Sequence, residues 1–303
     1  MSGHRSRAGL LAATVGLRLL LPIGWLLAHL PLGIGLSVGR RLGDALWWLL
    51  PGRRRVTLAN LARCLGREES PAQLRRLGRR SFQHVGMTVV EACRYFLRPT
   101  DVMLSRVRVE GSEHFKTAAA QGRGLLILTA HYGNWELLAA AHSLAGLPLS
   151  IVVRPLDHPV LDDLAARFRR RSGAELIIKR QAAREVLEAL RRQRMVGVLL
   201  DQNATRAEGV FVPFFGVPAS TSKGLAILAL RTGAPVVPVF LRRDPDGRHC
   251  IEVGPPIPPP ADRDVVAYTA LFNETLEATI RRAPEQWLWM HARWRTQPGK
   301  ATS

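Results

Sequence analysis

Residues 124–136 read GLLILTAHYGNWE, and this stretch contains the pattern that decides the fold. Its first part, residues 124–130, is a short apolar run between glycine and polar residues, which is typical of a buried parallel strand. The next segment, WELLAAAHSLAG, has helical character and ends at Gly146. A buried strand that leads directly into a helix is the repeating unit of α/β proteins.

The same alternation continues on both sides of this stretch. Further strands are expected at 107–110, 149–153, 175–178, 195–200, 234–243 and 249–254, with helical segments between most of them. Parallel strands need long crossover connections, and helices usually supply them. The sequence therefore predicts an α/β fold with a largely parallel central sheet flanked by helices.

The N-terminal part differs in composition, because it contains a long uncharged apolar run. Residues 19–39 form a run of 21 without Asp, Glu, Lys or Arg, long enough for a helix to span a hydrocarbon core of about 30 Å. Pro22 and Pro31 weaken it as a straight helix, so a buried or re-entrant hairpin is the alternative. We expect a membrane helix here.

Three regions follow from these patterns. Residues 1–40 are expected to be a membrane anchor, residues 41–104 a helical, membrane-proximal segment, and residues 105–303 the α/β domain. Within the helical segment, Ser70 followed by Pro71 is a good helix start, with serine as N-cap and proline in the first turn.

The chain is strongly basic. It has 43 Lys and Arg against 24 Asp and Glu, a formal net charge of +19, and 47% hydrophobic residues, which excludes a disordered chain. A cluster of arginines follows the apolar run: Arg40, Arg41, Arg53, Arg54 and Arg55. By the positive-inside rule they place the bulk of the chain in the cytoplasm, against an anionic membrane surface. No nucleic-acid-binding motif accompanies the charge, so we expect no nucleic acid partner.

His131 and Glu136 are the first candidates for chemistry. His131 would lie at the carboxyl end of a strand, where sites of open α/β sheets occur. Glu136 would lie in the first turn of the next helix and could fold back to orient the imidazole, with Gly133 and Asn134 forming the turn or cap. The alternative is a histidine that merely ends a strand and a glutamate that complements the helix dipole.

The HYGNWE segment resembles the H-x4-D/E motif of glycerolipid acyltransferases. Three further stretches narrow the resemblance to lipid A biosynthesis acyltransferases: 152–173, 196–240 and 283–298. The resemblance covers nearly the whole chain. It implies transfer of an acyl chain from acyl carrier protein, or from acyl-CoA, to a hydroxyl of a lipid A precursor at the bacterial inner membrane, without metal, other cofactor or covalent acyl-enzyme.

The resemblance also implies residue roles. His131 would be the general base and Glu136 would orient it. Arg154, Arg169, Asp201 and Asn134 would contribute to substrate binding; for Arg169 a solvated helix end, and for Asp201 a turn, are the alternatives.

Other readings stay open at this point. The acceptor could be a lysophospholipid, ornithine lipid or glycolipid, and the chain could be a non-catalytic lipid-binding protein. Residues 210–215, VFVPFF, could form a wall for the acyl chain or an ordinary core strand. Trp287, Trp289 and Trp294 could be interfacial anchors or core residues.

Overall fold

The computed structural model describes residues 22–98, 104–141, 148–153, 159–178 and 182–299. In this part a seven-stranded sheet has the order β1-β9-β8-β2-β5-β3-β4. Its strands are β1 (Val107–Glu110), β2 (Leu125–Thr129), β3 (Leu149–Val153), β4 (Glu175–Ile178), β5 (Met195–Leu199), β8 (Val236–Arg243) and β9 (His249–Val253). These ranges agree with the predicted strands to within two residues.

The sheet is mostly parallel, as predicted. β8, β2, β5, β3 and β4 run in one direction. β9 pairs antiparallel with β8, and β1 pairs parallel with β9. The antiparallel pair follows from chain length, because the short turn between Arg243 and His249 cannot make the crossover that a parallel neighbour needs.

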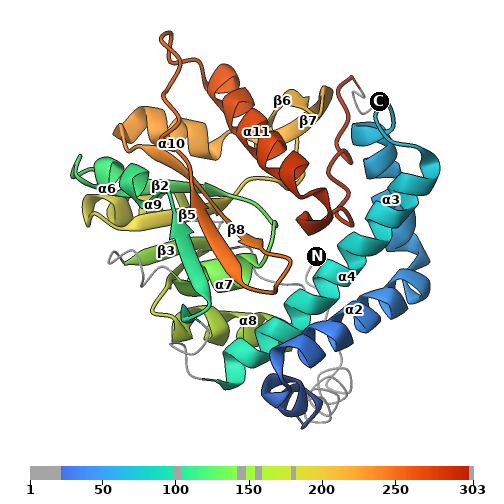
Figure 1. The fold of residues 1–303 in the computed structure, drawn as a ribbon. Helices are drawn as coiled ribbons and strands as arrows, with labels where there is room; N and C mark the ends of the chain where they lie inside the picture. Colours follow the sequence, from blue (N-terminus) through green and yellow to red (C-terminus); the bar gives the residue numbers. More distant parts are fainter. Residues whose placement is uncertain (1–21, 99–103, 142–147, 154–158, 179–181, 300–303) are drawn as a thin grey trace.

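Helices cover both faces of the sheet (Figure 1). On one face lie α9 (Ala182–Arg191), α10 (Gly224–Thr232) and α11 (Val265–Arg282). On the other lie α6 (Ser112–Ala119) and α7 (Trp135–Ala140), with α8 (Pro159–Arg171) beside α7 and β4. All five residues of β2 are buried, because alternate side chains enter the two cores.

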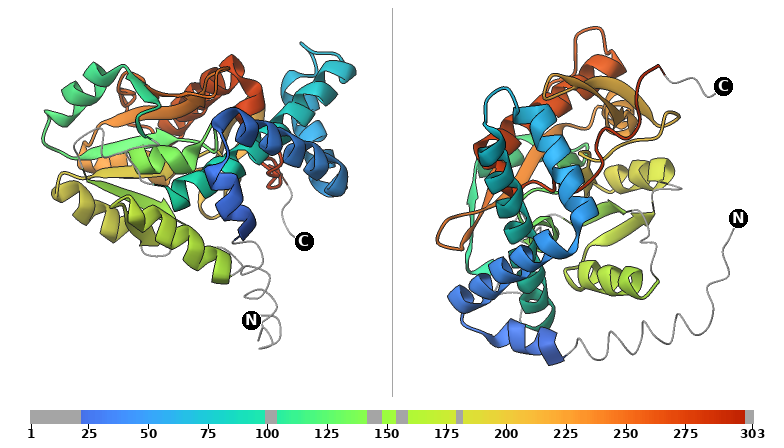
Figure 2. Two further views of the ribbon diagram at one scale, coloured as in Figure 1. Left: turned by 60° about the horizontal axis from the view of Figure 1, so that its bottom comes forward. Right: turned by 90° about the vertical axis from the view of Figure 1, so that its right-hand side faces the viewer.

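The helices α2 (Leu32–Leu49), α3 (Pro51–Leu65) and α4 (Pro71–Leu97), which follow a short helical segment at residues 22–29, precede the sheet and pack beside it (Figure 2). The predicted start of α4 is confirmed, because Ser70 caps it and forms a capping box with Gln73. The backbones of α2 and α4 come very close: a Cβ on Gly86 would lie 2.1 Å from the carbonyl oxygen of Gly39.

The predicted membrane helix is not confirmed. The described part of the apolar run breaks at Leu30 and Pro31, since Pro31 cannot donate the backbone hydrogen bond that would continue the helix into α2. Residues 1–21 lie outside the described ranges. Within those ranges, no helix has both the length and the apolar character needed to cross a bilayer.

One pair of strands was not predicted as such. β6 (Gly209–Phe214) and β7 (Val217–Ser222) form an antiparallel hairpin that packs against α11. The VFVPFF segment is thus a core strand, the second of its two readings. Phe214 stacks on Trp294 and meets Trp287 edge to face, and the three tryptophans of the closing segment are all buried. They are core residues.

Candidate active site

His131 and Asp201 form the centre of the candidate site. The Nδ1 atom of His131 lies 2.8 Å from Oδ1 of Asp201, and the backbone N–H of His131 donates to Oδ2 at 3.0 Å. Sheet order produces this contact. β2 and β5 are parallel neighbours in which Thr129 is opposite Leu199, so the residues two positions further along also meet.

Asp201 is held as a buried anion. Its side chain is 3% exposed, and it accepts a third hydrogen bond, of 2.8 Å, from Nε1 of Trp287. Burial alone would raise the pKa of Asp201, but the charge of His131 and these hydrogen bonds outweigh it, so the pKa lies below its usual value. Trp287 is therefore a site residue that the sequence did not identify. The sequence pointed to Trp287 only through its position in residues 283–298, which resemble the acyltransferase family.

The pairing with Asp201 raises the proton affinity of the His131 imidazole. Burial lowers the pKa of His131, but the charge and hydrogen bond of Asp201 raise it further, and the net pKa is above the ordinary value. A carboxylate on Nδ1 assigns the proton to that nitrogen, which leaves the Nε2 lone pair as an acceptor. Nε2 accepts a hydrogen bond of 3.3 Å from the side-chain amide NH₂ of the exposed residue Gln202.

Glu136 is not the group that orients His131 in this structure. Its carboxylate accepts hydrogen bonds of 2.7 and 3.2 Å from Arg169, near the end of α8. The first turn of α7 directs Glu136 toward its neighbour α8, while Asp201 approaches His131 from the adjacent strand. Glu136 contributes to the raised pKa of His131 only as a weaker charge. Arg169 is thus paired with Glu136 and is not part of a solvated helix end, which was the alternative.

Asn134 has a local role. It is 2% exposed; its Oδ1 accepts the N–H of Leu137 and caps α7, while its Nδ2 donates to the buried carboxylate of Glu91 in α4 at 2.7 Å. Glu91 is in turn paired with Arg243 of β8. The structure therefore bears out the predicted cap, but the side chain is already occupied and does not face a substrate. The fourth expected binding residue, Arg154, lies outside the described residues.

Gly133 explains the tight turn between His131 and Asn134. It has a φ of +58°, and a Cβ there would lie 1.5 Å from the carbonyl oxygen of Leu241. Only glycine fits this backbone, because its neighbour β8 leaves no room for a side chain.

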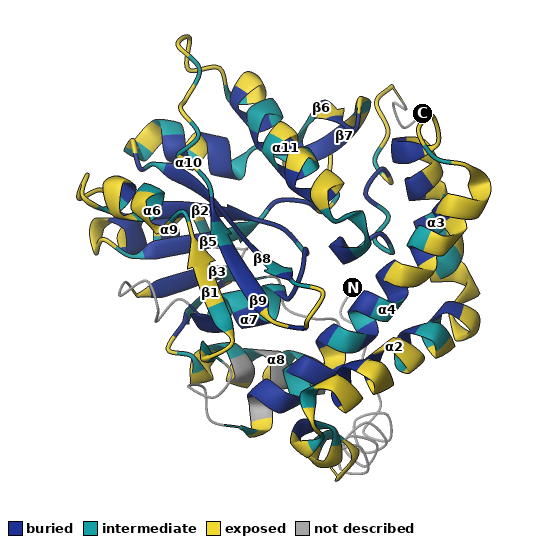
Figure 3. Cartoon of the chain, in the orientation of Figure 1, coloured by how far each residue is buried: buried dark blue, intermediate teal, exposed yellow. Residues whose placement is uncertain are grey.

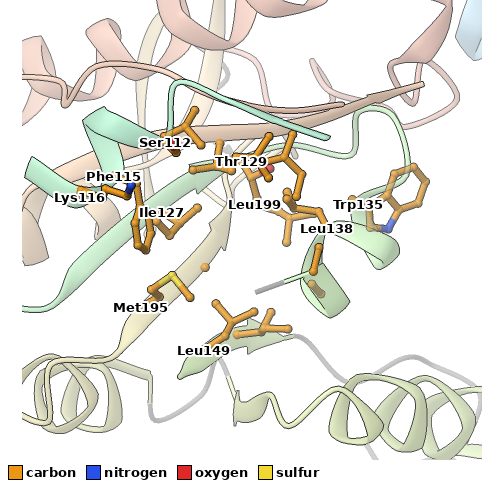
Figure 4. Close-up of a pocket in the computed structure, with 18 residues that line it drawn as sticks. Ser112, Phe115, Lys116, Ile127, Thr129, Trp135, Leu138, Leu149, Met195 and Leu199 are labelled. Atoms are coloured by element: carbon orange, nitrogen blue, oxygen red, sulfur yellow. The ribbon is translucent and has the colours of Figure 1, made fainter. Parts of the chain in front are cut away.

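A cavity of about 340 Å³ lies next to this centre (Figure 4). It is enclosed by the sheet on one side and by α6 and α7 on the other, and its lining is mostly apolar. Trp135, Thr129 and Leu199 line it near the site, while Phe115 and Met195 line it further away. The ring of Trp135 is 5.3 Å from that of His131, so one wall residue of the cavity contacts the histidine of the candidate site.

This combination defines a class of protein. A carboxylate-bound histidine beside an apolar cavity, at the carboxyl edge of a parallel sheet, is suited to base-assisted transfer of a group with a long apolar tail. The fold and site are thus those of an acyltransferase. The model of the family described as bacterial lipid A biosynthesis acyltransferase matches residues 4–296, and the chain belongs to this family.

Relatives from several bacteria agree with this assignment. The chain is 31% identical over 277 residues to a lipid A biosynthesis lauroyltransferase of Escherichia coli, covering 90% of this chain and 89% of the relative. It is 28% identical to a lipid A biosynthesis palmitoleoyltransferase of the same organism, with the same coverage. A phosphatidylinositol mannoside acyltransferase of Mycolicibacterium smegmatis is 28% identical over 186 residues, which is 60% of each chain.

Proposed function

We propose that this enzyme moves an acyl chain from the thioester of acyl carrier protein to a hydroxyl of a lipid A precursor, with His131 as general base. The observation that carries the proposal is the His131–Asp201 pair, whose imidazole contacts Trp135 in the wall of an apolar cavity. The likeness to lipid A acyltransferases over nine-tenths of the chain supports the acceptor class.

The reaction uses one base and no covalent acyl-enzyme. Nε2 of His131 accepts the proton of the acceptor hydroxyl as its oxygen bonds to the thioester carbon. The charged imidazole is stabilised by Asp201, which holds Nδ1–H. The tetrahedral intermediate then collapses, the carbon–sulfur bond breaks, and the imidazolium returns the proton to the departing thiolate.

The cavity is proposed to hold the acyl chain. Its walls come from alternate residues of the central strands together with α6 and α7, and it extends from Trp135 to Phe115 and Met195 (Figure 4). Each methylene that it removes from water contributes about 0.8 kcal/mol. Gly197 lies in the middle of its lining and leaves room that a side chain would fill.

An anionic membrane surface and an acidic carrier protein are the proposed partners, with the catalytic domain on the cytoplasmic side of the inner membrane. Large apolar side chains are exposed along the first helices, among them Trp25, Ile34, Trp48 and Leu49, with exposures of 54% to 73%. Figure 3 shows exposed residues along the outer sides of α2 and α3, where several arginines lie. Exposed tryptophan and leucine beside arginine favour binding in the interface of anionic lipids.

Mass spectrometry of total lipids tests the acceptor. Cells with the wild-type protein should contain lipid A heavier by one acyl chain than cells with the His131→Ala variant, produced at the same level. A gain on a phosphatidylinositol mannoside or another glycolipid, with unchanged lipid A, would refute the acceptor but keep the acyl transfer. Acyl transfer in vitro from acyl-CoA as fast as from the acyl carrier protein thioester would refute the donor.

A further inference from the structure

Thr129 is the last residue of β2, two positions before His131. Its side chain lines the cavity (Figure 4) among apolar neighbours such as Leu138 and Leu199. The residue is only 6% exposed. Its hydroxyl is fully buried and, within the part of the chain that the structure describes, has no hydrogen-bond partner.

A buried hydroxyl without a partner destabilises a protein, because its hydrogen bonds to water are lost and not replaced. Valine has nearly the same shape and would fill this strand position without that cost. An unpaired hydroxyl in the wall of an apolar cavity, two residues before His131, therefore indicates a polar atom of the ligand. An acyl chain has one polar group, the thioester carbonyl, and the transfer reaction requires it next to His131.

We propose that the Thr129 hydroxyl donates a hydrogen bond to the thioester carbonyl oxygen and to the oxyanion that forms from it. This inference rests on the proposed function. It makes Thr129 a catalytic residue in the same strand-to-turn segment as the base, one that touches the substrate from the cavity side while His131 acts on the acceptor hydroxyl.

The hydrogen bond strengthens during the reaction. As the acceptor oxygen bonds to the carbonyl carbon, its proton moves to Nε2 of His131 and the carbonyl π electrons move onto the oxygen held by Thr129. When the carbon–sulfur bond breaks, the oxyanion electrons restore the carbonyl and the proton passes from His131 to the sulfur. A donor on the developing charge lowers the barrier more than it strengthens substrate binding.

The test compares Thr129→Val with Thr57→Val in steady-state transfer from acyl carrier protein thioesters. Thr57 in α3 also has a fully buried hydroxyl without a partner, so the same change is made away from the cavity. Thr129→Val should lower kcat by about 100-fold with little change in KM. Its melting temperature should be unchanged or higher by about 2 °C, because an unpaired polar group is removed. Thr57→Val should keep its kcat.

Two results would overturn the assignment. One is a kcat for Thr129→Val within about twofold of the wild type. The other is a changed preference for chain length with normal kcat on the preferred chain, which is the effect of a wall residue.

If Thr129→Val unfolds, Thr129→Ser and Thr129→Ala replace it, since both lack the methyl group and only serine keeps the hydroxyl. Serine should then be much faster than alanine, and equal rates would refute the donor. A wild-type protein without transferase activity would instead refute the proposed function itself.

Discussion

Replacing Asp201 with asparagine removes the charge that faces His131 and keeps the shape of the side chain. Asp201 accepts two hydrogen bonds from His131 and one from Trp287. An amide has one acceptor oxygen and an NH₂ group, so it can donate to Nδ1. That would move the imidazole proton to Nε2, where the base needs a lone pair.

The size of the effect follows from the contact that is lost. A hydrogen bond to a charged group contributes about 1.5–3 kcal/mol, which corresponds to a loss of about 10- to 150-fold in kcat, and the tautomer change adds to it. Glu136→Gln should cost much less. Its pair with Arg169 is partly exposed, with side chains 21% and 20% exposed, so about 1 kcal/mol or a fivefold loss is the upper range.

The pH dependence gives a second readout. A general base must be neutral, so kcat/KM should rise with pH through the pKa of His131, which Asp201 raises above the ordinary value of about 6.5. In Asp201→Asn the carboxylate charge no longer raises the pKa of His131, and burial lowers it. The rise of kcat/KM should therefore move to lower pH, and the plateau of kcat/KM at high pH should be lower than in the wild type. Glu136→Gln should move the rise in the same direction by less.

The assay is acyl transfer to lipid A precursor over a pH series, with Asp246→Asn as control. Asp246 lies in the exposed turn between β8 and β9, where the same change touches no site residue. Circular dichroism and melting temperature verify that each variant is folded. A larger loss for Glu136→Gln than for Asp201→Asn would refute the reasoning and return the orienting role to Glu136.

Three further substitutions test other parts of the molecule. Gly197→Leu should fill room for about four carbons of the chain, so the preferred donor in a series of graded acyl lengths should become shorter; an unchanged preference would exclude this cavity as the chain site. Glu91→Gln should lower the free energy of unfolding in urea by about 3–5 kcal/mol at pH 7, because buried Arg243 loses its partner. Burial alone would raise the pKa of Glu91, but the charge of Arg243 above all lowers it, so the wild type should lose this stability as the pH falls below about 4.3. A stability difference between wild type and Glu91→Gln that does not change with pH would contradict the pairing. Leu49→Ser should weaken binding to anionic vesicles, while Val266→Ser on the exposed side of α11 should not; equal binding would argue against α2 as the docking surface.

Local chemistry explains why much of the fold could be predicted. The strands of the parallel sheet are short apolar runs. Because such a strand is buried on both faces, its consecutive residues are apolar, as in residues 125–128, and this pattern can be recognised in the sequence. The start of α4 depends on Ser70, Pro71 and Gln73, which are adjacent in sequence. The β6–β7 hairpin was missed because its strands mix apolar, proline and small polar residues, and only packing against α11 makes them a unit.

The sequence by itself determined that His131 ends a buried strand and stands in an acyltransferase motif, because both are properties of one short segment. Tertiary structure decided its partner. Glu136 is five residues away and Asp201 is seventy, yet the order of strands places β5 beside β2 and brings Asp201 to Nδ1. The same sheet and helices enclose the cavity in which Thr129 has no partner. Strand order and the space between layers depend on contacts across the whole chain, and no local pattern records them.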